Sequence, residues 1–188
     1  MATQRTRNMV HAALFTAVIC AVAPFSIKIG PIPLTFATLV IYIAAGSLGW
    51  KFGAASVALY VVLGAIGLPV FANFEGGFHK IAGVTGGFII GYLPCALAAG
   101  LGADVGNKLW SYISGLITGT LLLYTCGTAW FIYQTGATLP ASLTMCVTPF
   151  LIGDTIKIVF AVIVTPKLRK ALAVNRGAVQ KDSVKHEQ

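Results

Sequence analysis

Residues 148–166 read TPFLIGDTIKIVFAVIVTP, an apolar run that holds one carboxylate and one ammonium group, those of Asp154 and Lys157. A spacing of three residues places both side chains on one face of a helix. A charged group at membrane depth costs roughly 2.5–3.5 kcal/mol on insertion scales, and such groups are commonly functional. We interpret the pair as a ligand anchor. The alternative is a structural ion pair that holds two helices together.

The composition is that of an integral membrane protein. Of 188 residues, 57% are hydrophobic and 10% are charged, and the mean hydropathy is +0.85. Soluble domains contain about 25% charged residues. The net charge of +8 does not indicate nucleic-acid binding, because the basic residues flank apolar segments instead of forming a stripe with aromatic residues.

The motifs of catalysis and of metal binding are missing from the sequence. Its four cysteines show no CxxC or Cys/His spacing, which predicts free thiols, no metal ligands and no disulfides. The chain lacks a GxxxxGK[ST] loop, a GxSxG elbow and an HExxH motif. We therefore expect no enzyme, no cofactor and no catalytic residues. The expected molecule holds a small ligand and has no energy source of its own.

The apolar pattern predicts an all-α bundle of six transmembrane helices. A helix needs about 20 residues to cross the hydrocarbon core. The sequence Gly49-Trp50-Lys51 allows only a tight hairpin between two of the segments. Residues 28–33 and 71–83 are expected to be irregular, because they are rich in Gly and Pro. The six predicted helices are 9–25, 34–48, 52–71, 85–101, 109–133 and 149–167.

Cationic residues favour an orientation with both termini in the cytoplasm. In this orientation only Lys28 and Lys80 lie outside, and residues 175–188 form a flexible cytoplasmic tail behind a membrane domain of residues 1–174. The inner side then carries Arg5, Arg7, Lys51, Lys108, Lys167, Arg169, Lys170, Arg176, Lys181 and Lys185.

The first segment also has features of a signal peptide, namely Arg5 and Arg7 followed by an apolar run and Ala21-Val22-Ala23. Cleavage there would leave Pro24 at the new terminus, which is unfavourable for processing. We therefore expect a retained helix.

Two Gly- and Pro-rich loops and the charged pair are expected on the same outer side of the membrane. Residues 67–92 combine flexible glycines with Asn73 and flat apolar side chains, a mixture suited to a lid over a small ligand. His79, with Glu75 and Lys80, is expected at a hydrated loop tip. Gly83, Gly87 and Gly91 favour a helix-packing seam over a role in the lid. The apolar walls are Phe71, Phe74, Phe78 and Phe88.

Ala13, Ala17 and Ala21 form a smooth stripe at four-residue spacing on the first predicted helix. Such a stripe lets helices approach closely. It either packs inside the bundle or docks a partner in the membrane, and the sequence leaves both open.

At these residues the chain resembles the BioY family, the biotin-specific S components of energy-coupling factor (ECF) vitamin transporters. Two departures stand out. Ala37 replaces a frequent Gln, which removes a ligand role from that position, and Val84 replaces a frequent Pro. The resemblance rests on residues 30–35 (GPIPLT), 64–71 (GAIGLPVF), 76–77 with 85–88 (GG and TGGF), and 149–154 (PFLIGD) with Lys157.

This resemblance implies a multi-pass subunit of the bacterial plasma membrane that captures biotin from outside. It would act with a transmembrane coupling protein and two cytoplasmic ATPases, which alone use ATP, and the alanine stripe would be the docking surface. The rival hypotheses are a stand-alone ion- or proton-coupled carrier, an intramembrane enzyme, and an S component for another vitamin. The implied biotin-binding residues are Asp154, Lys157, Asn73, Phe71, Phe74, Tyr92 and Thr35.

Overall fold

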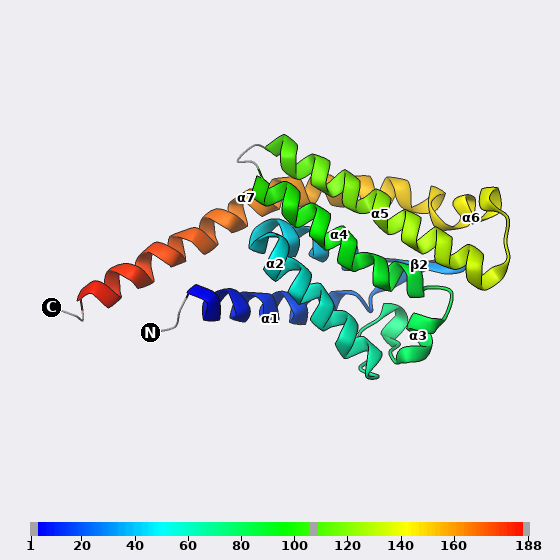
Figure 1. Cartoon of the computed structure of the whole chain (residues 1–188), viewed down its shortest axis with the longest axis horizontal. Coiled ribbons are helices and arrows are strands. Elements are labelled where there is room, and N and C mark those ends of the chain that lie inside the picture. Colours follow the sequence, from blue (N-terminus) through cyan, green and yellow to red (C-terminus); the bar gives the residue numbers. More distant parts are fainter. Residues whose placement is uncertain (1–3, 106–108, 186–188) are drawn as a thin grey trace.

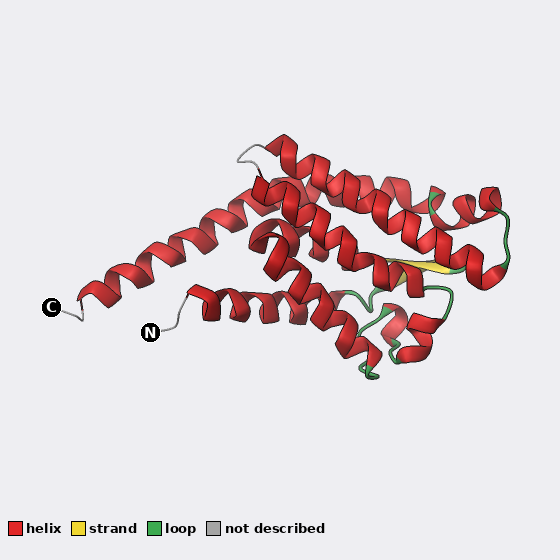
Figure 2. Cartoon of the chain, viewed as in Figure 1, coloured by secondary structure: helices red, strands yellow, loops and turns green. Residues whose placement is uncertain are grey.

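The computed structural model describes residues 4–105 and 109–185. Lys108, one of the basic residues predicted to lie on the inner side, is outside the described residues. The chain forms a helical bundle with both ends of the chain at the same end of the molecule (Figure 1). The strands and most loops gather at the opposite end (Figure 2). In chain order the elements are α1 (Gln4–Val22), β1 (Ser26–Ile29), β2 (Ile32–Thr35), α2 (Ala37–Ala65), the 3-10 helix η1 (Ala72–Phe74), α3 (Phe78–Ala82), α4 (Gly86–Val105), α5 (Leu109–Thr135), α6 (Leu139–Cys146) and α7 (Thr148–Lys185).

Helix α2 consists of two arms that meet at Gly49, whose φ of 81° and ψ of 176° are not helical. The arms fold back on each other, because a Cβ atom placed on Gly53 would lie 2.6 Å from the Cα of Ala45. A positive φ of this size favours glycine. The reversal predicted at residues 49–51 is therefore present, and the arms correspond to the predicted helices 34–48 and 52–71.

Helices α4 and α5 pack closely through small residues. A Cβ on Gly87 would lie 2.6 Å from the carbonyl oxygen of Cys126, and one on Gly102 would lie 2.7 Å from the Cα of Gly115. Gly87 and Gly91 face α5, as expected for a packing seam, whereas Gly83 precedes α4 and caps α3. The predicted seam is therefore correct for two of its three glycines.

The structure corrects the expectation that residues 28–33 form an irregular loop. They belong to an antiparallel ribbon in which Ser26 pairs with Thr35 and Ile29 pairs with Ile32. The Gly30-Pro31 turn joins the two strands, with a φ of 79° at Gly30. Residues 71–83 are also more regular than expected, since they contain η1 and α3.

The C-terminal region differs from the sequence pattern in two ways. Helix α6 was not predicted, because its eight residues are too short to cross a membrane. Helix α7 continues to Lys185, well past the predicted end at residue 167. The division into a membrane domain of residues 1–174 and a flexible cytoplasmic tail stays a prediction, and residues 186–188 lie outside the described part of the chain.

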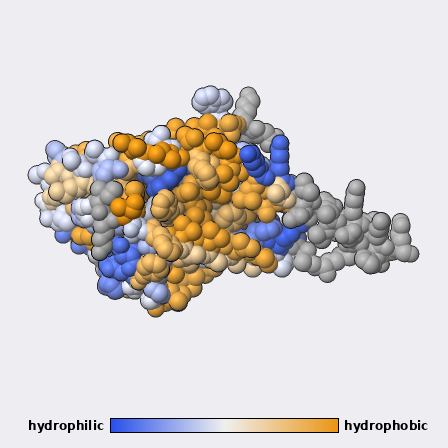
Figure 3. Space-filling view, turned by 180° about the vertical axis from the view of Figure 1, so that it is seen from behind, coloured by the Kyte–Doolittle hydropathy of each residue, from blue (hydrophilic) through white to orange (hydrophobic). Residues whose placement is uncertain are grey.

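The surface is divided into zones along the bundle. Seen from behind, an apolar middle lies between two more hydrophilic ends (Figure 3). This is the distribution expected for a protein embedded in a bilayer. Four helices in the described residues are long and apolar enough to cross a membrane, namely Ala37–Ala65, Gly86–Val105, Leu109–Thr135 and Thr148–Leu172.

Candidate functional site

A cavity of about 410 Å³ opens at the end of the bundle that carries the ribbon and the loops. Its volume is within the usual range of about 300–1,000 Å³ for small-molecule sites. The turn of the ribbon forms one side. The segment of residues 71–83, hereafter the lid segment, forms the other. The helical walls come from Tyr60 of α2 and from Phe88, Ile89 and Tyr92 of α4.

A smaller pocket of about 30 Å³ contains Asp154 and Lys157. The two cavities are adjacent, because five residues line both of them. The charged pair therefore lies next to the main cavity but does not itself line it. The shared residues are Ile32, Pro33, Thr35, Phe88 and Tyr92.

Asp154 and Lys157 are only 4% and 7% exposed, and their side chains form an ion pair with 2.9 Å between Lys157 Nζ and Asp154 Oδ1. Lys157 Nζ also donates to the Thr38 hydroxyl at 2.9 Å and to the Thr35 carbonyl oxygen at 2.8 Å. Asp154 Oδ2 accepts a hydrogen bond of 2.6 Å from the Tyr124 hydroxyl. The ammonium group thus uses all three of its donors.

The pair is neutral as a unit and fully hydrogen-bonded, so it can remain buried without a ligand. A polar ligand group that reaches it must exchange with Thr35 or Thr38. Thr35 provides the link to the main cavity. Its hydroxyl lies 3.4 Å from the Tyr92 hydroxyl, and its carbonyl binds Lys157.

An aromatic wall joins α2, the lid segment and α4. Phe71 is buried, and its ring meets that of Tyr60 edge-on with 5.6 Å between centroids. The centroid of the Tyr60 ring in turn lies 6.4 Å from that of the Tyr92 ring. Flat apolar surfaces of this kind favour an apolar ring system in the cavity.

Asn73 lines the cavity in an unusual backbone conformation. Its φ is 61° and that of Phe74 is 58°, both in the left-handed region. Non-glycine residues adopt this region rarely, and such residues cluster at ligand sites. The Asn73 N–H donates to the Pro24 carbonyl oxygen at 2.9 Å, which ties the lid segment to the end of α1.

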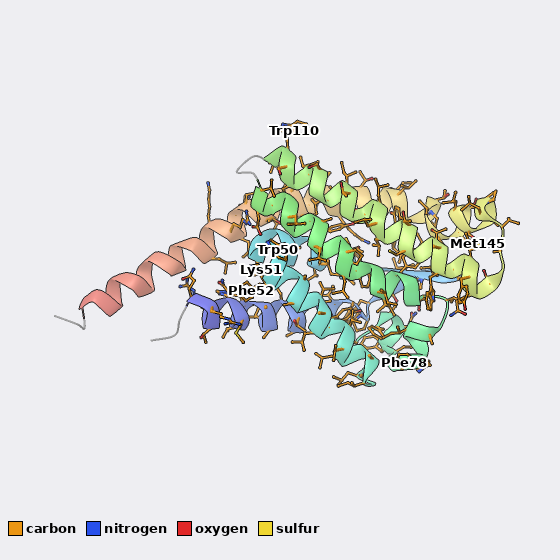
Figure 4. The ribbon with its side chains drawn as sticks, viewed as in Figure 1. Trp50, Lys51, Phe52, Phe78, Trp110 and Met145 are labelled. Carbon is orange, nitrogen blue, oxygen red and sulfur yellow. The ribbon has the colours of Figure 1, made fainter. Side chains whose placement is uncertain are left out.

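Two of the four phenylalanines expected as walls lie elsewhere. Phe71 and Phe88 line the cavity. Phe74 is 60% exposed and packs edge-on against Phe25, with 5.4 Å between centroids. Phe78 is exposed at the start of α3, at the end of the molecule that carries the loops (Figure 4). The sequence showed that aromatic residues gather here but could not show which way each one turns.

The charged residues of the lid segment lie at the cavity wall. Lys80 forms a salt bridge with Glu75, and exposed His79 is adjacent to them. The exposure of Glu75 and His79 is compatible with the expected loop tip, but both residues and Lys80 also line the cavity. Trp130 of α5 holds the end of the lid segment, because its Nε1–H donates to the Gly83 carbonyl oxygen at 2.9 Å.

The alanine stripe of α1 faces outward. Ala13, Ala17 and Ala21 are exposed, whereas Thr16 and Ile19 belong to the buried face of the helix. Of the two alternatives left open by the sequence, packing inside this bundle is therefore wrong.

Sequence reasoning missed Thr38 and Tyr124, which complete the hydrogen bonding of the charged pair. They come from α2 and α5, so no local spacing relates them to Asp154. The sequence gives no local signal for either residue. Thr38 comes three residues after the end of the ribbon in the sequence, whereas Tyr124 lies in the middle of the apolar helix α5 with no neighbouring motif that marks it.

Comparisons with known proteins agree with the geometry. The family model described as BioY family matches residues 1–174. The chain is 35% identical to the biotin transporter BioY of Thermotoga maritima, over 87% of this chain and 96% of the relative. It is 37% identical to a probable biotin transporter BioY of Pyrococcus horikoshii, over 84% of this chain and 93% of the relative.

A solved structure has the same fold. It is the crystal structure of the S component for biotin from an ECF-type ABC transporter, with a TM-score of 0.82 and 28% sequence identity. The match covers 90% of this chain and 94% of the other. The family and these relatives are transporters, not enzymes.

Proposed function

This chain belongs to the BioY family, and we propose that it is the membrane-embedded biotin-binding S component of an ECF-type importer. One observation carries the proposal. A cavity of about 410 Å³ with aromatic walls lies beside a buried Asp–Lys pair, in a fold shared with an S component for biotin.

We infer that the chain crosses the plasma membrane of its cell six times, through α1, the two arms of α2, α4, α5 and α7. Both termini lie at one end of the bundle, and that end carries most of the lysines and arginines. The bias of Lys and Arg toward cytoplasmic loops supports an orientation with both termini inside. The cavity lies at the opposite end and opens to the outside.

The chemistry of the site suits the polar ureido ring of biotin and its apolar ring and chain. The ureido ring offers two N–H donors and a carbonyl acceptor. Asp154 accepts from an N–H, Lys157 donates to the carbonyl, and the Asn73 amide can do either. Thr35 and Tyr92 connect the pair with the cavity and give way to the ligand. Phe71 covers the apolar ring and chain, at about 0.8 kcal/mol for each buried CH₂ group. Phe74 acts indirectly, by fixing the lid segment against Phe25.

Transport needs energy that this chain does not supply. We infer that a transmembrane coupling protein and two cytoplasmic ATPases provide it. The exposed stripe of Ala13, Ala17 and Ala21 is the proposed docking surface, because small side chains let a partner helix approach closely.

Filling the alanine stripe should uncouple transport from binding. In Ala17→Leu we expect biotin uptake by the assembled transporter to fall by about tenfold or more, because a leucine keeps the partner helix at a distance. Biotin affinity in detergent should stay within twofold, since Ala17 is exposed and does not line the cavity. The matched control is Val18→Leu on the neighbouring exposed position. Equal uptake by Ala17→Leu and the control would contradict the docking role.

The identity of the ligand is tested by purification. The protein is extracted in mild detergent from cells grown with biotin, and the bound small molecule is identified by mass spectrometry. We expect biotin in about equimolar amount, and calorimetry on the ligand-free protein should show binding of biotin but not of thiamine or riboflavin. A different bound vitamin would refute the proposed substrate, and uptake by vesicles that contain this chain alone would favour a self-sufficient carrier.

A further inference from the structure

A second cavity, of about 440 Å³, lies at the end of the bundle where both termini are found. Figure 4 shows Trp50, Lys51 and Phe52 together at this end, far from Phe78 at the outer end. The proposed biotin site does not use this cavity, which we call the terminal cavity. Its lining residues come from α1 (Asn8), from both sides of the Gly49 joint of α2 (Ser47, Leu48, Trp50, Lys51 and Phe52), from α4 (Asp104) and from α7 (Arg169).

Two buried polar atoms on the wall of the terminal cavity lack a partner. Within the described part of the chain, neither Ser47 Oγ nor Asn8 Oδ1 has a hydrogen-bond partner. Ser47 is only 4% exposed, so bulk water does not compensate for the missing bond. Buried polar groups are nearly always satisfied, and an exception calls for an unseen partner. The hydroxyl can donate or accept, and the amide oxygen needs a donor.

The charges of the terminal cavity favour an anion. Arg169 binds Asp104 with 2.6 Å between the guanidinium nitrogen and Oδ1, and it also donates to the Ala103 carbonyl oxygen at 2.6 Å. The Trp50 N–H donates to the other Asp104 oxygen at 3.0 Å. Asp104 is thereby neutralised. The Lys51 ammonium lies 5.1 Å above the Trp50 ring and remains as the excess charge among the described lining residues.

We propose that the terminal cavity binds the headgroup of an anionic phospholipid with a hydroxylated headgroup, such as phosphatidylglycerol. The phosphate accepts hydrogen bonds from Lys51 and Ser47, and a glycerol hydroxyl donates to Asn8 Oδ1. Basic pockets between membrane helices bind lipid headgroups in this way. Trp50, which lines the cavity, is partly exposed, and tryptophan is enriched at the membrane–water interface, where headgroups lie.

Native mass spectrometry of the full chain in detergent tests the proposal. Phosphatidylglycerol is compared with phosphatidylcholine of the same acyl chains, which carries no net charge and no headgroup donor. We expect selective retention of phosphatidylglycerol. Lys51→Gln should lower its affinity about tenfold, whereas Lys170→Gln, which removes an equal charge from an exposed position of α7, should change it less than twofold.

A second variant separates the lipid role from a purely structural one. Ser47→Ala removes an unpaired hydroxyl, so its melting temperature in lipid-free detergent should equal or exceed that of the native chain. The increase in melting temperature on adding phosphatidylglycerol should be smaller in Ser47→Ala. Biotin affinity should stay within twofold in all variants, which confirms that they are folded.

Three results would overturn the proposal. If Lys51→Gln and Lys170→Gln lowered the affinity for phosphatidylglycerol equally, the binding would be nonspecific attraction of anionic lipid. Binding of sn-glycerol 3-phosphate with the same dependence on Lys51 would identify a soluble ligand. Unchanged lipid binding in Lys51→Gln, together with lost assembly with the coupling protein, would assign the cavity to that partner.

Discussion

Biotin binding should weaken by about 30-fold or more when Asp154 is changed to Asn or Lys157 to Met. Removing one partner of a buried, hydrogen-bonded charge pair costs roughly 2–5 kcal/mol in binding, and the lower limit corresponds to about 30-fold. Each substitution removes one of the two groups that complement the ureido ring. The side chains are similar in size to the originals, so the aromatic walls of the cavity remain.

The hydrogen bonds of the pair make each single variant costly for the fold as well. In Lys157→Met, Asp154 keeps the Tyr124 hydroxyl but loses its ammonium partner. A buried charge left without its partner destabilises a protein by about 3–5 kcal/mol. Lower affinity in a single variant could therefore reflect partial unfolding. A double variant is needed to separate binding from stability.

The double variant Asp154→Leu with Lys157→Met removes both charges together. Replacing a buried ion pair by apolar groups of similar volume is often neutral or stabilising. We expect a melting temperature above that of either single variant, while biotin binding remains weak by calorimetry. Wild-type affinity in the double variant would show that the pair only braces α7 against its neighbours.

Local spacing decided which parts of the site the sequence could predict. Asp154 and Lys157 are three residues apart on one helix, so their contact follows from helix geometry alone. Thr38 binds the same pair from 116 residues away in the chain, and Tyr124 does so from 30 residues away. Those contacts depend on how the helices pack, which no local pattern encodes.

The same reasoning applies to the fold. The reversal at Gly49 was predictable, because a Gly-Trp-Lys sequence separates two long apolar runs. The β-ribbon was missed, because Gly30-Pro31 indicates a turn while the four-residue strands on either side are too short to show a clear alternation. Helix α6 was missed because its eight residues carry no membrane-spanning signal.

Asn73 combines a backbone role and a side-chain role, and two substitutions distinguish them. Its φ of 61° suits asparagine, which tolerates the left-handed region better than most residues. Asn73→Gly removes the amide and keeps this conformation accessible, whereas Asn73→Ala removes the amide and strains the backbone by about 1–2 kcal/mol. Comparing the two variants isolates the contribution of the side chain.

We expect Asn73→Gly to weaken biotin binding by about tenfold or more, because a charge-free hydrogen bond to a buried ligand group is worth about 0.5–1.5 kcal/mol and its loss leaves that group unsatisfied. Asn73→Ala should bind at least as weakly, and the lid segment should also exchange its amide hydrogens faster, since strain at residue 73 loosens the bond from its N–H to Pro24. Calorimetry measures the affinities, and hydrogen exchange with mass spectrometry measures the lid segment. If Asn73→Gly bound biotin as the native chain does while Asn73→Ala did not, residue 73 would serve the lid only through its backbone, and the ureido ring would be held by Asp154 and Lys157 without a third polar contact.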